Sequence, residues 1–156
     1  MRVDVESDAE LLKAYDSFEQ SIATAGRQGQ DVLDRCINRS LWIAHHYNGR
    51  ELLVETNGGR FLHVHCHAGK VVWQVLESRP VDLEPCLLDE STIVFRFPSG
   101  EEAAWHWREV LDSFRGRPFA LAVSDALLFM FWRDGPEYLF NCYRSESDVY
   151  LVLGEC

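Results

Sequence analysis

The sequence predicts an α+β fold in which antiparallel strands outnumber helices. The middle of the chain alternates apolar and polar residues between Asn-Gly, Gly-Gly and Ala-Gly turn signals, which is typical of a strand meander. Two segments outside this meander have capped, amphipathic helical patterns and are expected to pack on the sheet. Strands and helices do not alternate along the chain, so a parallel strand–helix–strand sheet is not expected. The 156 residues fit a single domain, 1–156, with its own core.

The first predicted helix covers residues 7–26. Ser7 and Glu10 have the spacing of a capping box, in which the two side chains satisfy free backbone N–H groups of the first turn. Apolar residues then recur every three or four positions as far as Ile22, and Gly26 stands where a C-terminal cap belongs.

A short helical turn over residues 31–37 leads into four predicted strands. Asn48-Gly49 is expected to form a two-residue type I′ turn between the first two strands. Asn57-Gly58-Gly59 and Ala68-Gly69 are expected to join the second strand to the third and the third to the fourth. The strands between these turns cover residues 41–47, 50–56, 60–67 and 70–77.

The length of the middle turn sets the register of the second and third of these strands. A three-residue loop places Leu52 opposite Val64 and Glu51 opposite His65, and it gathers the apolar residues on one face. A two-residue loop would divide them between the faces. The expected buried face is Leu41, Ile43, Leu52, Val54, Leu62, Val64, Cys66, Val71, Trp73 and Val75. The expected outer face is mixed: Trp42, Ala44, His46, Glu51, Leu53, Glu55, Phe61, His63, His65, His67, Val72, Gln74 and Leu76.

The rest of the chain is predicted to hold one more helix and five more strands. Residues 79–90, here named the acidic connection, form an irregular segment interrupted by two prolines. The helix is predicted over 99–116, where Ser99 and Glu102 repeat the capping-box spacing and Trp107 belongs to the apolar stripe. Strands are predicted over 92–97, 119–123, 126–132, 137–143 and 149–153.

The charge of the chain limits its partners. Its 25 acidic and 15 basic residues give a formal net charge of −10, which repels nucleic-acid phosphates and anionic lipids. We therefore expect neither nucleic acid nor membrane as a partner, and we expect a basic protein instead. Residues 77–112 carry nine carboxylates and three arginines, a local charge of −6, whereas residues 21–76 have a local charge of +2.

The five cysteines are widely spaced and include no Cys-x-x-Cys motif. Cys66 and Cys142 lie in strand patterns and are expected to be free, inert core thiols. The first ten residues lack the pattern of an export peptide, and the longest apolar stretch, residues 126–132, is too short to span a bilayer. Together these features predict a cytoplasmic protein in a reducing environment.

The row His63, His65 and His67 is the strongest candidate for chemistry. Residues two apart on a strand share a face, and the predicted turns bring His46, Glu51 and His65 side by side on three strands at spacings of about 4.8 Å. Two imidazoles and a carboxylate are a plausible metal-ligand set for hydrolysis. The outer two histidines of the row lie about 13 Å apart and cannot share one ion. A contact surface is the favoured interpretation of this face, and a pH-sensitive interface is a further alternative.

No nucleotide-binding loop, nucleophile elbow or zinc signature occurs in the sequence, and no cofactor is predicted. Trp105 lies off the apolar stripe of the second predicted helix. It is therefore a candidate exposed anchor for a partner, with packing against a neighbouring loop as the alternative.

In size, acidity and lack of catalytic motifs, the chain is similar to the small immunity proteins that bacteria pair with toxic effectors. The resemblance implies a non-enzymatic inhibitor that neutralises a cognate toxin, for example a nuclease, by occluding its basic active site. The alternatives are a metal-dependent hydrolase that uses the histidine and carboxylate set, and a small-ligand-binding regulatory domain. The predicted interface is Asp82, Glu84, Asp89 and Glu90, with Glu51, His63, His65 and Trp105 as further candidates.

Overall fold

Antiparallel sheets dominate the computed structural model, which describes residues 1–6, 29–86, 88, 90–124, 127–146 and 148–156. A short helix over residues 29–36 and the helix α2 (Trp107–Phe114) accompany the strands. The strands are β1 (Arg2–Asp4), β2 (Trp42–Tyr47), β3 (Glu51–Thr56), β4 (Phe61–His67), β5 (Lys70–Leu76), β6 (Ile93–Arg96), β7 (Glu102–Trp105), β8 (Phe119–Ser124), β9 (Leu127–Trp132), β10 (Glu137–Ser145) and β11 (Asp148–Glu155). The predicted α+β class is therefore confirmed in its broad character.

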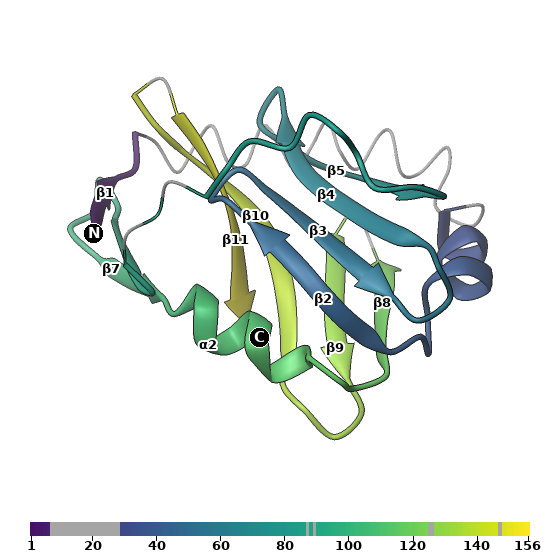
Figure 1. Ribbon diagram of the computed structural model, residues 1–156. Coiled ribbons are helices and arrows are strands. Elements are labelled where there is room, and N and C mark those ends of the chain that lie inside the picture. The colour runs from purple at the N-terminus through teal and green to yellow at the C-terminus, as the bar shows by residue number, and fades with distance from the viewer. Residues whose placement is uncertain (7–28, 87, 89, 125–126, 147) are drawn as a thin grey trace.

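Two four-stranded meanders pack face to face (Figure 1). One sheet has the order β2-β3-β4-β5 and the other has the order β11-β10-β9-β8. Across the layers β10 contacts β5, and β11 contacts β3 and β4. A small third sheet, β1-β6-β7, stands beside them, and its β1–β6 pair is parallel. The largest fully buried side chains of the core are Trp42, Phe95, Phe114, Phe119 and Phe140.

The predicted register of the middle turn is confirmed. Leu52 lies opposite Val64 and Glu51 lies opposite His65. The next turn is also confirmed as a two-residue loop, since His67 pairs with Lys70 and both loop residues have positive φ. All four predicted C-terminal strands are present, and the predicted turn over 31–37 corresponds to the helix over 29–36.

The turn between β2 and β3 differs from the prediction. His46 lies opposite Leu53, two residues beyond the predicted partner Glu51. The reason is the side chain of Asn48, whose Oδ1 accepts the backbone N–H groups of Arg50 and Glu51, both at 3.0 Å. This contact centres the turn on Gly49 and Arg50, so the predicted alignment of His46 with Glu51 is wrong.

An irregularity in β2 exchanges two predicted faces. The ladder shifts between Trp42 and Ala44, with the result that Trp42 is fully buried and Ile43 is 47% exposed. The prediction placed Trp42 on the outer face and Ile43 on the buried face. A bulge adds one residue to one strand and turns the following side chains over, and here it buries the larger side chain.

The helix α2 begins eight residues later than predicted. Pro98, Ser99 and Gly100 form the turn of the β6–β7 hairpin, in which Gly100 has φ +89° and donates its N–H to the Phe97 carbonyl. Strand pairing with β6 therefore replaces the predicted capping box at Ser99. The other predicted helix, residues 7–26, lies outside the described residues.

The prediction that Trp105 is an exposed anchor is wrong. Trp105 is the last residue of β7 and is not part of a helix, and its side chain is 3% exposed. Its Nε1 donates to the Tyr47 hydroxyl at 3.1 Å, and that hydroxyl donates to the Leu151 carbonyl at 2.6 Å. Trp105 is thus part of the core and is not available to a partner.

Cys66 and Cys142 form a disulfide between β4 and β10, which corrects the prediction of two free thiols. Both side chains were expected to face the core, but the register alone could not show that they meet across the two sheets. Disulfides persist in oxidising compartments, so this bond removes one of the arguments for a reducing cytosol. Among the residues that the structure describes, no helix is long and apolar enough to cross a membrane.

Side chains from the helix over residues 29–36 and from the turn after it cover the edge of β8 that pairs with no strand of its sheet. Asn38 accepts the Leu121 N–H at 2.7 Å and donates to the Leu121 carbonyl at 3.0 Å. Gln30 accepts the Val123 N–H at 2.8 Å and donates to the same carbonyl at 3.1 Å. These amides satisfy backbone groups that an exposed edge strand would offer to another chain.

Replacing Asn38 with alanine is expected to lower the free energy of unfolding by about 1–3 kcal/mol, because the Leu121 N–H loses its acceptor. Urea denaturation measures the change. Asp31→Ala is the matched control, since Asp31 is an exposed residue of the same helix. Equal losses in the two variants would show that the edge contact contributes nothing.

Candidate functional site

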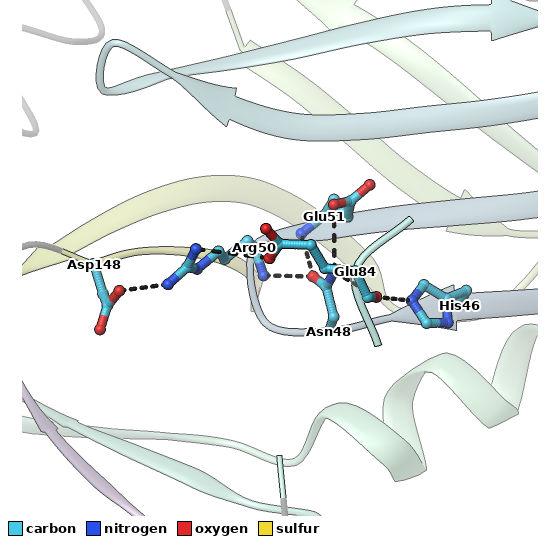
Figure 2. A network of polar contacts seen from close by, with 6 residues as sticks. All are labelled: His46, Asn48, Arg50, Glu51, Glu84 and Asp148. Carbon is cyan, nitrogen blue, oxygen red and sulfur yellow. Dashed lines mark hydrogen bonds and ion pairs between the residues drawn. The ribbon is translucent and has the colours of Figure 1, made fainter. Parts of the chain in front are cut away.

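The acidic connection crosses the outer face of the β2–β5 sheet and is fixed there by its main chain. The Glu84 carbonyl accepts hydrogen bonds from His46 Nε2 at 2.8 Å and from Asn48 Nδ2 at 3.2 Å. Figure 2 shows both side chains converging on Glu84 from the end of β2 and the turn that follows it. A carbonyl can only accept, so His46 carries its proton on Nε2.

Arg50 joins three parts of the molecule. Its guanidinium lies 2.6 Å from Asp148 at the start of β11 and 3.7 Å from the Glu84 carboxylate (Figure 2). The Glu84 side chain nevertheless stays 63% exposed. The backbone of Glu84 is therefore held in place while its charge faces solvent.

The acidic connection presents both charge and an apolar side chain to solvent. Asp82, Glu84 and Glu90 are exposed, and Val81 is fully exposed beside them. Asp89, the fourth predicted interface residue, lies outside the described residues. Asp82 and Glu84 thus stand on the exposed side of this segment, whereas the Glu90 carboxylate at its end is paired with the N-terminal amine of Met1.

Beneath the acidic connection, the histidine row forms a bonded group with Glu51. His63 Nε2 donates to the Glu51 carboxylate at 2.8 Å, and Gln74 donates to His63 Nδ1 at 3.3 Å. These bonds engage both ring nitrogens, and the His63 and Glu51 side chains are only 13% and 18% exposed. The His63 and His65 rings stack with centroids 5.0 Å apart.

His65 is placed differently from His63. Its Nδ1 is shielded from solvent and has no hydrogen-bond partner among the described residues. Burial lowers the pKa of His65, and the neighbouring His63 lowers it further, whereas Glu51 acts in the opposite direction. The ring is therefore biased toward its neutral form.

The predicted metal-ligand set is not brought together as expected. Glu51 pairs with His65, but His46 lies opposite Leu53 and bonds the Glu84 carbonyl instead. Within the described residues, no group of three His, Cys, Asp or Glu side chains is arranged to hold a metal ion. The face is better described as the floor beneath the acidic connection.

Sequence reasoning missed Asn48, Arg50 and Gln74, which hold this site together. Asn48 was assigned only to the turn, although an Asn side chain in a turn also has donors to spare for a neighbouring segment. No sequence pattern marks the contacts of Arg50, because its partners lie 34 and 98 residues away along the chain.

The stability of the protein is expected to fall as the pH drops below about 6.5, the ordinary pKa of histidine. Burial lowers the pKa of His45 and of His65 in the folded chain, and the charge of Arg115 adds to the effect at His45. The unfolded chain then binds more protons, so stability is lost at up to about 1.4 kcal/mol per pH unit for each histidine.

Urea denaturation between pH 7.5 and 5.5 measures this slope. The double variant His45→Asn, His65→Gln should show a smaller slope of stability against pH, whatever the stability of the variant at pH 7.5. An unchanged slope would assign the pH dependence to other groups.

No family model, curated protein or solved structure matches this chain significantly. The features that bear on function are therefore the acidic connection and the sheet face beneath it.

Proposed function

We propose that the protein is a binding protein of the immunity or inhibitor class, which neutralises a basic toxin by covering its active site. The observation that carries this proposal is the part of the acidic connection around Glu84, whose carbonyl is held by two hydrogen bonds while the Asp82 and Glu84 side chains are exposed. Long-range attraction between opposite charges accelerates encounter, and a prearranged surface lowers the entropy lost on binding. In this proposal the protein acts without cofactor or catalysis.

The contacts at Glu84 favour docking over a purely solvating role. A solvating segment needs no defined backbone, whereas this one is fastened by His46 and Asn48 through its main chain. The fully exposed Val81 adds an apolar contact next to Asp82. Charged rims around an apolar contact are common in protein interfaces.

The partner is sought by pull-down with the products of neighbouring genes. Changing Asp82, Glu84 and Glu90 together to lysine is expected to lower the affinity for that partner at least about 100-fold, mainly through a slower association rate. The anchoring hydrogen bonds at Glu84 use its carbonyl and survive the change.

The matched control reverses three exposed carboxylates elsewhere, Glu101, Glu137 and Glu155, and shifts the net charge by the same amount. The control should retain most of the affinity. If both triple variants bind equally well or equally poorly, the acidic connection is not the interface.

A further inference from the structure

A pocket of about 310 Å³ lies between the acidic connection and the outer face of β3 and β4. Its walls include Glu51, His63 and His65 from the sheet and Asp82 and Glu84 from the connection. This volume is at the lower end of the range for small-ligand sites, roughly 300–1,000 Å³. It suits one side chain better than a cofactor.

The charges around the pocket favour a cation. Three carboxylates line it against one arginine, Arg50, which already contacts Asp148 at 2.6 Å and Glu84 at 3.7 Å. Both ring nitrogens of His63 are already hydrogen-bonded, Nε2 to Glu51 and Nδ1 to Gln74. The Glu51 side chain is only 18% exposed, so its charge is less screened by water.

The shape of the wall favours a planar cation. The His63 and His65 rings stack on each other, so the surface left to a guanidinium is an outer face of this pair, and a guanidinium can also pair with the carboxylates. Burial biases the His65 ring toward its neutral form, so this imidazole adds no positive charge that would oppose a cation.

We propose that this pocket receives one arginine side chain of the basic protein partner, paired with Glu51 and Asp82 and stacked on an outer face of the His63–His65 pair. The inference rests on the proposed function and names the residue type through which the partner is recognised. Val81, fully exposed at the same segment, then contacts the partner surface around that arginine.

The first test needs no partner. The full chain is titrated with N-acetylarginine amide, and the imidazole and backbone NMR signals are followed. Saturable changes are expected at Glu51, His63, His65 and residues 82–84, and none with the neutral isostere N-acetylcitrulline amide. Equal responses to the two compounds, or no saturable response at these residues, would overturn the inference.

Two substitutions sharpen this test. Glu51→Gln keeps an acceptor for His63 but removes the charge, and it should weaken binding of the arginine derivative at least about 5-fold, in keeping with a charged hydrogen-bonded pair. Glu55→Gln is the matched control, since Glu55 lies on the same strand and face but outside this pocket. If Glu51→Gln disturbs the fold, Asp82→Asn takes its place, because Asp82 is exposed. This variant should also weaken binding of the arginine derivative.

Once the partner is identified, binding measurements on the variants distinguish the two proposals. If reversal of the acidic connection abolishes binding but Glu51→Gln has no effect, the pocket inference fails and the proposed function stands. If the arginine derivative binds as described but reversal of the acidic connection leaves partner binding intact, the pocket stands as a cation site and the proposed function fails.

Discussion

Replacing Trp42 with alanine is expected to lower the free energy of unfolding by about 3–5 kcal/mol, as deletion of a large buried aromatic side chain does. Trp42 is fully buried and stacks on Phe114 with ring centroids 4.8 Å apart. It also packs edge-on against Phe119 at 5.1 Å. The indole thus joins β2 to α2 and β8, so its removal leaves a cavity where three elements meet.

Trp42→Phe separates the packing from the polar contact of the indole. Nε1 of Trp42 donates to His45 Nδ1 at 3.0 Å, and phenylalanine keeps an aromatic ring but loses this bond. We expect the phenylalanine variant to lose clearly less stability than the alanine variant in urea denaturation. A loss below about 1 kcal/mol in the alanine variant would contradict the burial of this side chain.

Removal of the Cys66–Cys142 disulfide by the double change to alanine is expected to cost about 4 kcal/mol. The cross-link closes a segment of 76 residues, and in the chain-entropy model a loop of this length restricts the unfolded chain by roughly that amount. It also joins β4 to β10, so the two sheets lose their covalent connection. The midpoint and slope of urea denaturation give the change.

Cys86→Ala is the control, because Cys86 is exposed and unpaired in the structure. It should leave the stability nearly unchanged. Peptide mapping without reductant tests the pairing directly. Recovery of Cys66 and Cys142 as alkylated free thiols from the oxidised protein would show that the bond does not form.

Local signals predicted the β3–β4 and β4–β5 hairpins correctly, but not the turn between β2 and β3. Ala68-Gly69 specifies a tight turn because Gly accepts positive φ readily, and both residues adopt it. The register of β3 and β4 followed from the requirement that apolar residues share a face. The acidic connection was also recognised, since its prolines and charges disfavour a paired strand.

The same reasoning failed where two local signals competed. Ser99 and Glu102 have the spacing of a helix start, but Pro98-Ser99-Gly100 is equally a turn, and the partner strand β6 decides between them. In β2, the sequence alone could not show that a bulge turns Trp42 inward. The bulge is favoured by what the indole meets there, namely Phe114 and Phe119, which are remote in sequence.

The candidate site shows the same division. The sequence by itself determined that the chain is acidic, that residues 79–90 form an irregular charged segment, and that Glu51 lies beside His65 on a shared sheet face. Only the tertiary structure decided that this segment lies over that face, that Glu84 is fastened by His46 and Asn48, and that Cys66 meets Cys142. The physical reason is range: turn chemistry and strand alternation act between near neighbours, whereas these contacts join residues 36 to 76 positions apart and form only when the sheets and the connection pack together.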